Sequence, residues 1–427
     1  MDTLKNKIDY KSIIFFSIIL IIAFSLRIYN LNFEDYWLDE QASFWVANPS
    51  LTLSETLERG KDLDRGTSIV FNLLLKEFFI FFEYDPEVGR YLPFIFGLIS
   101  IPALCYLTFQ IRKNKSYLLV GILSSINFYL ISYSQEVRVY SFVFLISIIS
   151  IIFFFNLLEN EKTPKKKFIN SIFYIFFSFL GVCLHIFFFI IIFSQFLFLC
   201  LNFLTREKKL IFNLLCTLII PILYIFFMYE YLLLQIGIKD FWIQQVNLEF
   251  FYNFFFSRFF GSKIMGIIYL SILIYLICIN IKRLFNFEEK SFLLILILFF
   301  SYSLPLLYSL FRQPILIDRY IIFVLIPIFI LIAVLILEIK SLKIRYFILT
   351  VILTSSLVNN YIEIFNREKK KPEFNKVLKY ISDTNFTKIV TKSNIKIIEK
   401  IIINYAKNTR IKKTNNIQFL YSDFDYS

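Results

Sequence analysis

The sequence predicts an all-α polytopic membrane protein that carries a small α/β appendage at its C-terminal end. Of the 427 residues, 58% are hydrophobic and 20% are aromatic, while only nine are glycine. A single soluble core cannot bury so much apolar surface, whereas a lipid bilayer can solvate it. Apolar runs near the length of a membrane helix, about 20 residues, recur along the chain and define its architecture.

The predicted membrane domain covers residues 1–362. Its apolar runs are 12–29, 91–111, 117–133, 137–158, 168–204, 210–229, 264–281, 291–310, 320–337 and 346–361. The run 168–204 is about twice the length of one span, so we expect two helices that meet near His185. The total is about 11 to 12 transmembrane helices. The first run is too long for the apolar part of a secretion signal, and we interpret it as a retained anchor.

The charges flanking these runs predict the orientation in the membrane. Lysines precede the first run, and the loop that follows it, residues 30–90, is rich in acids. By the positive-inside rule the N-terminus is cytoplasmic and this first loop is extracytoplasmic. The later basic clusters then all lie inside, provided that residues 66–82 do not cross. Lys76 and Glu77 interrupt that short segment, which favours interfacial helices in the first outer loop.

The last part of the chain, residues 363–427, predicts a small soluble appendage on the outer face. Helix-like stretches at 372–382 and 395–407 alternate with strand-like stretches at 388–391 and 417–421. We interpret the lysines here as a solvated surface, with contact to anionic membrane lipids as the alternative. The net charge of +13 is scattered in short clusters rather than gathered on one face, so no nucleic-acid partner is expected.

An adjacent acid pair, Asp39 and Glu40, follows the aromatic residues Tyr36 and Trp37 just beyond the first helix. Ionisable groups are costly in hydrocarbon, so acids and bases gathered at one membrane face are candidates for function. A carboxylate beside aromatic side chains can accept a proton from a hydroxyl near neutral pH. Asp39 is therefore our candidate general base. The alternative is a helix-capping or solvated acid.

Two further polar segments are expected at the same face. The link 132–140 contains Glu136 and Arg138, and a later helix begins at Asp318-Arg319-Tyr320. The guanidinium of arginine presents a fixed fork of donors that matches phosphate oxygens. Taken singly, Arg138 and Arg319 are better explained as ordinary helix-end anchors, and a phosphate contact is favoured only when the two are considered together. His185, the single histidine, is more typical of a hydrogen-bonded packing group than of a catalyst.

The sequence predicts no metal site and no other cofactor. Asp62-Leu63-Asp64 matches the acid-x-acid pattern that can hold a divalent cation against a diphosphate, but so short a pattern occurs freely by chance, and a divalent metal remains an alternative. All five cysteines lie in apolar runs, which favours neither a disulfide nor a zinc site. The chain has no glycine-rich phosphate loop, HExxH motif or nucleophile elbow, which argues against an ATP-driven pump, a zinc protease and an α/β-hydrolase.

Five short motifs occur in a characteristic order along the chain. They are Leu26–Glu40, Arg90–Phe94, Tyr133–Tyr140, Leu184–Phe187 and Asp318–Tyr320. Together they resemble the bacterial GT-C glycosyltransferases related to protein O-mannosyltransferases and to the lipid A aminoarabinose transferase. The resemblance implies a GT-C transmembrane domain.

The resemblance also implies a reaction. A sugar would pass, with inversion, from a polyprenyl-phosphate donor to a hydroxyl of a lipid, polysaccharide or protein at the outer face of the cytoplasmic membrane. Asp39 would act as base on the acceptor, and the other implied substrate-binding residues are Glu40, Asp64, Glu136, Arg138, His185 and Arg319. The family's acid at the end of the first loop precedes a Pro-Pro pair, whereas Asp64 precedes Arg65-Gly66-Thr67. Without a metal, Arg138 and Arg319 would stabilise the phosphate leaving group, with Arg27 and Arg90 as reserves.

Two other classes of protein remain open at this point. A transporter or flippase could move isoprenoid-linked glycans without transferring them, but transporters tend to place charges near the bilayer midplane in repeated halves. An oligosaccharide ligase or polymerase would share the lipid-linked substrate. We expect such an enzyme to centre on a large outer loop in the second half, whereas the loop 230–263 is of moderate size and lacks histidine.

Overall fold

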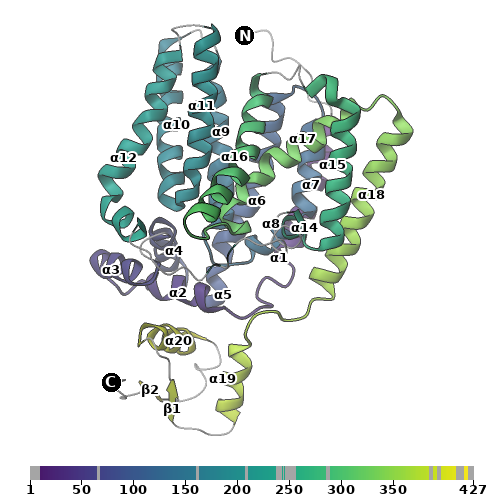
Figure 1. Ribbon diagram of the computed structural model, residues 1–427. Coiled ribbons are helices and arrows are strands. Elements are labelled where there is room, and N and C mark those ends of the chain that lie inside the picture. Colours follow the sequence, from purple (N-terminus) through teal and green to yellow (C-terminus); the bar gives the residue numbers. More distant parts are fainter. Residues whose placement is uncertain are drawn as a thin grey trace.

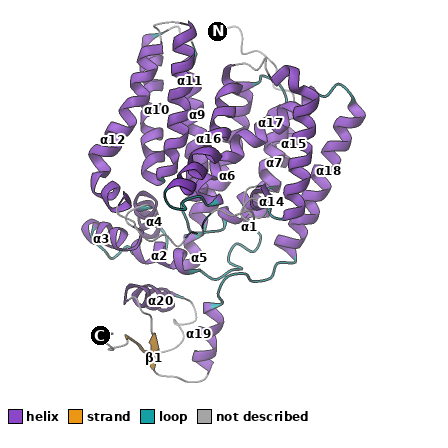
Figure 2. Cartoon of the chain, viewed as in Figure 1, coloured by secondary structure: helices purple, strands orange, loops and turns teal. Residues whose placement is uncertain are grey.

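The computed structural model describes residues 10–64, 68–159, 163–206, 210–236, 243, 245, 256–284, 289–383, 388–391, 396–409 and 418–421. Long helices form one bundle, and the short helices of the first loop lie across one end of it (Figure 1). The C-terminal appendage lies beyond that same end. Almost all regular structure is helical (Figure 2).

Nine helices among the described residues are long and apolar enough to cross a membrane, so the chain is a multi-pass membrane protein. They are α1 (Tyr10–Ile28), α6 (Tyr91–Ile111, extending the short α5, Pro86–Gly89), α9 (Tyr140–Leu158), α10 (Pro164–Leu184), α12 (Ile211–Ile236), α15 (Lys263–Leu284), α16 (Glu289–Phe311), α17 (Leu325–Glu338, extending η4, Asp318–Val324) and α18 (Leu342–Asn360). The bent pair α7–α8 counts as a tenth, and α11 (Phe189–Arg206) is a shorter apolar helix. Every apolar run of the sequence corresponds to one of these elements, and the prediction of an all-α polytopic fold is confirmed.

Two of the predicted runs are broken helices. The run 168–204 divides at His185 as expected, between α10 and the short η1 (Ile186–Phe188) that leads into α11. The run 117–133 was expected to be one helix, and this is wrong, because α7 (Ser116–Ile126) and α8 (Phe128–Ser134) meet at an angle of 62°. Asn127 makes the break, since its side-chain oxygen accepts the Leu130 N–H (2.9 Å) and thereby caps α8. Hydropathy alone does not detect such a cap.

The centre of the bundle is α17. Every residue from Leu325 to Ile336 is buried, with α7, α15 and α16 packed around it. A helix that is apolar on all sides and buried on all sides belongs in the middle of a large assembly. By contrast, α1 and α12 expose large apolar side chains such as Phe15 and Phe226. These surfaces suit contact with lipid.

The first loop folds into α2 (Leu38–Val46), α3 (Leu53–Asp64), α4 (Ile69–Phe81) and α5. At 13 residues, α4 is about 20 Å long and too short for a hydrocarbon layer of about 30 Å. It packs against α2, α3, α5 and the end of α10. Lys76 is buried there and donates to the Thr56 hydroxyl (3.1 Å). The segment is therefore not one of the candidate spans.

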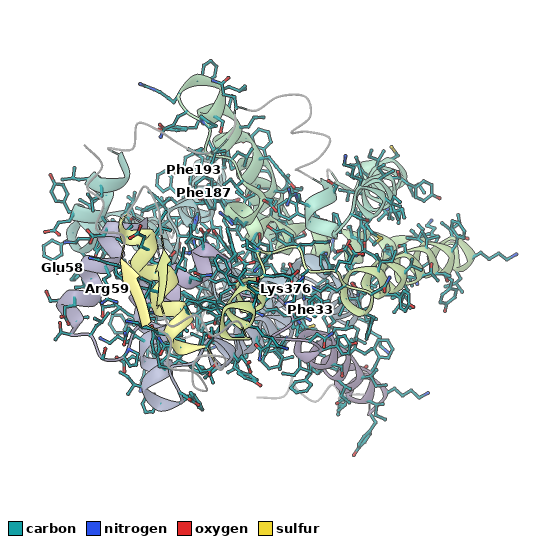
Figure 3. The ribbon with its side chains drawn as sticks, turned by 90° about the horizontal axis from the view of Figure 1, so that it is seen from below. Phe33, Glu58, Arg59, Phe187, Phe193 and Lys376 are labelled. Carbon is teal, nitrogen blue, oxygen red and sulfur yellow. The ribbon has the colours of Figure 1, made fainter. Side chains whose placement is uncertain are left out.

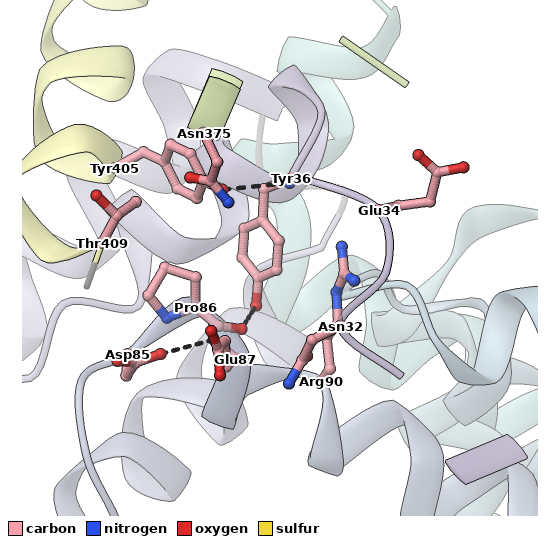
Figure 4. A pocket seen from close by; sticks show the side chains of 10 residues that line it. All are labelled: Asn32, Glu34, Tyr36, Asp85, Pro86, Glu87, Arg90, Asn375, Tyr405 and Thr409. Atoms are coloured by element: carbon pink, nitrogen blue, oxygen red, sulfur yellow. Dashed lines mark hydrogen bonds between the residues drawn. The ribbon is translucent and has the colours of Figure 1, made fainter. Parts of the chain in front are cut away.

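The appendage contains α19 (Phe374–Asp383), β1 (Lys388–Thr391), α20 (Lys396–Asn408) and β2 (Gln418–Tyr421). The two strands pair in parallel, with Lys388 opposite Gln418, so α20 serves as the crossover that a parallel pair requires. All four elements lie within two residues of their predicted bounds. The appendage contacts the first loop, because α20 packs on α2 and the ring of Tyr405 stacks on that of Tyr36 at 5.6 Å (Figure 4).

Candidate functional site

Asp39 lies in the first turn of α2, at the end of the bundle that carries the first loop. Its side chain is 32% exposed, whereas that of the neighbouring Glu40 is fully buried. Two arginines approach the same carboxylate oxygen, Oδ2: Nη2 of Arg319 at 3.6 Å and Nη2 of Arg138 at 3.9 Å. The structure thus brings together the predicted base and both predicted phosphate-binding arginines, which come from three segments far apart in the sequence.

Neighbouring groups fix the two arginines. Nη1 of Arg138 donates to the backbone oxygen of Asp39 (3.1 Å) and to the Ser43 hydroxyl (3.3 Å). The guanidinium of Arg319 lies over the rings of Trp37 (5.3 Å) and Tyr140 (5.6 Å). A guanidinium held on aromatic faces keeps its orientation through cation–π attraction. Both arginines are therefore held in an orientation toward Asp39.

Glu40 is a structural centre of the site. Its Oε1 accepts the Val137 N–H (2.9 Å) and lies 3.7 Å from Nη2 of Arg90, while its Oε2 lies 2.8 Å from Nζ of Lys371. Burial by itself would raise the pKa of Glu40, but Lys371, Arg90 and the hydrogen bonds outweigh burial and lower it. Glu40 is thus a buried, charged anchor rather than an accessible acid.

Glu136 lies in the short link between α8 and α9 and pairs with Lys371 at 3.2 Å. The preceding residue, Gln135, donates to the backbone oxygens of Arg27 (2.9 Å) and Tyr29 (3.0 Å). These bonds hold the link 135–138 against the end of α1. From this short link, Arg138 approaches Asp39 and Glu136 approaches Lys371.

His185 is buried close to the arginine pair. Its Nδ1 accepts the Phe187 N–H (3.3 Å), and its ring centre lies 4.8 Å from that of Tyr320. Burial, together with the charges of Arg138 and Arg319, lowers the pKa of His185 to about 3. The imidazole is therefore neutral at pH 7, and the bond at Nδ1 places its proton on Nε2. It can donate a hydrogen bond, but it does not supply a proton near neutral pH.

Asp64, the last predicted site residue, ends α3, and its side chain lies outside the described residues. Its neighbour Asp62 lines a different cleft, of about 500 Å³, where α3 faces Lys400 and Lys407 of α20. In the view onto this end of the molecule, Glu58 and Arg59 of α3 lie to one side, away from Lys376 of α19 (Figure 3). Over the described ranges, the structure does not bring three or more His, Cys, Asp or Glu side chains together as metal ligands.

The two reserve arginines have structural partners instead. Arg27 is fully buried and donates to the backbone oxygens of Ser124 and Ser125, both at 3.0 Å, in the last turn of α7. Arg90 donates to the backbone oxygen of Leu31 (2.9 Å) and lies over the Tyr36 ring (5.1 Å). Arg27 caps a helix end, and Arg90 supports Glu40, so neither is directed at Asp39.

A cavity of about 580 Å³ opens beside the site, bounded by α8, α14 (Phe256–Phe260), the start of α15 and the tail. Asp39, Arg138 and Arg319 do not line it, but Glu136 and Asp318, close to these arginines in sequence, do. The cationic residues in its wall are Arg90, Arg258, Lys263, Arg367, Lys370 and Lys371, and the acidic ones are Glu34, Glu136, Asp318 and Glu363. Such a wall suits a ligand that carries an anionic group and hydroxyls.

The tail contributes residues to the site that the sequence does not predict. The expectation that the lysines of 363–427 form a solvated surface is wrong for Lys369 and Lys371. Lys369 pairs with Asp35 (3.5 Å), and Lys371 pairs with Glu40 and Glu136. The available signal was the excess of acidic over basic residues in the first loop, which basic residues elsewhere in the chain can neutralise. Arg258 and Lys263 were missed as well, because nothing in their sequence distinguishes them from helix-end anchors.

The helical bundle, with its first loop folded into short helices across one end, has the GT-C fold of polytopic membrane proteins. Similarity to solved structures of two proteins supports this assignment of the fold. ArnT from Cupriavidus metallidurans matches with a TM-score of 0.57 at 10% identity over 93% of this chain and 71% of its own. The archaeal oligosaccharyltransferase AglB from Archaeoglobus fulgidus, in complex with an inhibitory peptide and a dolichol-phosphate, matches with a TM-score of 0.54 at 11% identity.

The match to AglB covers 98% of this chain but only 62% of AglB. ArnT has also been solved bound to undecaprenyl phosphate, and that structure matches with a TM-score of 0.52 at 10% identity over 82% of this chain and 64% of its own. No known family profile and no curated protein matches the sequence. The likeness therefore establishes the fold, which is the fold that the sequence motifs predicted.

Proposed function

We propose that this protein is a membrane glycosyltransferase that moves a sugar from a polyprenyl-phosphate donor to a hydroxyl acceptor. The observation that carries the proposal is the partly exposed Asp39 carboxylate, flanked by Arg138 and Arg319 on the first loop of a GT-C fold. This arrangement combines a proton acceptor with two phosphate-binding groups. A transfer with a lipid phosphate as leaving group needs both.

In the proposed mechanism, Asp39 removes the proton of the acceptor hydroxyl as that oxygen attacks the anomeric carbon. The bond from the anomeric carbon to the phosphate oxygen breaks in the same step, so the configuration inverts. General-base catalysis of this kind contributes roughly 100- to 10,000-fold in rate. Asp39 suits the role because it is accessible, whereas Glu40 is buried and occupied by four partners.

The leaving phosphate gains negative charge and needs cations already in place. Arg138 and Arg319 are fixed within 4 Å of Asp39 by hydrogen bonds and aromatic faces. Such preorganised donors stabilise developing charge without a cost of reorganisation at the moment of reaction. The cationic cavity next to them has room for the phosphate and sugar of a donor, and Arg258 and Lys263 stand in its wall. His185, as a neutral donor, fits a contact to substrate oxygen.

The outer face of the cytoplasmic membrane is the proposed location of the site. The distribution of basic clusters in the sequence supports this orientation. The first loop and the tail lie at one end of the bundle (Figure 1), and the arginine pair approaches Asp39 of that loop. A lipid-phosphate donor is supported by the structures of ArnT bound to undecaprenyl phosphate and of AglB in complex with a dolichol-phosphate. The acceptor belongs to the broad class of lipid, polysaccharide or protein hydroxyls.

A transfer assay with an isosteric variant tests the proposal. Membranes carrying the wild type, Asp39→Asn or Glu58→Gln would be supplied with polyprenyl-phosphate-linked hexoses and pentoses, each radiolabelled in the sugar. We expect label in an endogenous acceptor with the wild type and with Glu58→Gln, an acid of α3 away from the site, and a loss of roughly 100-fold or more with Asp39→Asn. Transfer by Asp39→Asn at the wild-type rate would remove Asp39 as the base. Absence of transfer by the wild type with every donor would favour the transporter.

A further inference from the structure

The tail crosses the first loop through residues 367–371, which we call the strap. Three of its side chains pair with three acids that the sequence places near the membrane surface: Arg367 with Glu34 (3.4 Å), Lys369 with Asp35 (3.5 Å), and Lys371 with Glu40 (2.8 Å). The backbone N–H groups of Lys370 and Lys371 also donate to Glu34, at 3.1 and 3.3 Å. The strap is therefore bound to the first loop by main-chain and side-chain contacts together.

Lys371 differs from the other strap residues in what it joins. Its ammonium lies 2.8 Å from Glu40 Oε2 and 3.2 Å from Glu136 Oε2, and also 5.7 Å from the centre of the Trp37 ring. Burial by itself would lower the pKa of Lys371, but Glu40 and Glu136 outweigh burial and raise it. One charged side chain of the tail thus bridges the first loop and the link between α8 and α9.

Glu40 connects Lys371 with the backbone on either side of the Asp39–Arg138 pair. Its Oε2 accepts the N–H of Trp37 (3.4 Å), the N-cap residue of α2 two positions before Asp39, and its Oε1 accepts the Val137 N–H (2.9 Å). Arg138, next to Val137, donates to the backbone oxygen of Asp39 (3.1 Å). The position of the base relative to the arginine therefore depends on Glu40 and Glu136, both of which Lys371 holds.

We propose that Lys371 is a positioning residue of the transfer reaction, bridging Glu40 and Glu136 so that Asp39 and Arg138 keep the separation that transfer requires. The inference rests on the proposed function and assigns a role in it to the C-terminal appendage. Lys371 lies behind Glu40 and does not contact Asp39 in the structure, so its removal displaces the base without removing it. Displacements of about 1 Å at a reacting group can cost up to roughly 100-fold in rate.

The test compares three substitutions by steady-state kinetics in detergent-solubilised full-length protein, with the donor that gives transfer in the assay above. Lys371→Met keeps the length of the side chain but removes its charge, and we expect kcat to fall about tenfold or more while KM for the donor changes less than about threefold. Lys371→Arg restores the charge and should recover most of kcat. Lys376→Met is the matched control, because its ammonium is exposed and lies near Glu373 of the tail alone among the described acids.

A second variant keeps the test decisive if Lys371→Met does not fold. Glu136→Gln removes one of the two pairs from the other side, and it should lower kcat in the same direction with less effect on KM. Wild-type kcat in both Lys371→Met and Glu136→Gln would overturn the inference while leaving the proposed function intact. A loss of folded protein in Lys371→Met, with wild-type kcat in Glu136→Gln and Lys371→Arg, would make Lys371 a purely structural residue and would overturn it as well.

Discussion

Two arginine environments in this protein differ in what surrounds them. Arg27 is enclosed in the bundle and donates to the carbonyls of Ser124 and Ser125, which end α7 and have no partner within that helix. Arg138 and Arg319, at the end of the bundle, face the partly exposed carboxylate of Asp39. Carbonyls at a helix end need a hydrogen-bond donor at all times. An accessible carboxylate and its arginine partners can instead separate and bind a substrate. Burial of an arginine therefore does not by itself indicate a functional site. The group that the arginine contacts is the better indicator.

The largest expected effect comes from the site arginine. Arg319→Gln should lower the rate of sugar transfer roughly 100- to 1000-fold, because one preorganised donor to the leaving phosphate is lost. Thermal stability in detergent should stay close to that of the wild type, since Asp39 remains partly solvated. Arg312→Gln, at an exposed arginine in the connection between α16 and η4, serves as control. Full activity of Arg319→Gln would show that Arg319 does not bind the leaving phosphate, and Arg319 would then not differ from Arg27 in function.

The bundle arginine should give the opposite pattern. Arg27→Leu removes two charged hydrogen bonds from the end of α7 but also relieves a buried charge, and we expect a net loss of about 2 kcal/mol in the free energy of unfolding. Transfer per folded molecule should stay within about twofold of the wild type. Denaturation in detergent, with activity normalised to folded protein, measures both quantities. A selective loss of turnover with normal stability would contradict this prediction and assign Arg27 a role in the reaction rather than in stabilising the fold.

A smaller effect is expected from the titration of the strap contacts. The pKa of Glu40 is lowered in the folded protein, so its contribution to stability is complete above its ordinary value of 4.5 and disappears as the pH falls through the lowered value. The pKa of Lys371 is raised, so its contribution is complete below 10.5 and disappears as the pH rises through the raised value. Thermal midpoints measured across pH should therefore decline on both sides of a broad plateau. A Glu40→Gln variant that kept the same acid decline would assign it to other carboxylates.

Much of the fold could be predicted because transmembrane helices are local. Each needs a run of apolar residues, and every run identified in the sequence is a helix or a broken helix of the bundle. The break at His185 was predicted from length alone. The break at Asn127 was not, because the Asn127 side chain caps α8 by accepting the Leu130 N–H and also donates to the backbone oxygen of Phe259, which is distant in the sequence.

The sequence by itself determined that this chain lies in a membrane, which segments span it, and that Asp39, Arg138 and Arg319 belong at one face. Those conclusions follow from solvation, because the cost of placing a charged residue in hydrocarbon depends on that residue alone and can be estimated from the local sequence. Only the tertiary structure decided which charges meet. Lys371 and Glu40 are 331 residues apart, and a lysine in a polar tail has the same sequence signature whether water or a buried carboxylate surrounds it. The partner is fixed by packing of the appendage on the first loop, which hydropathy does not encode.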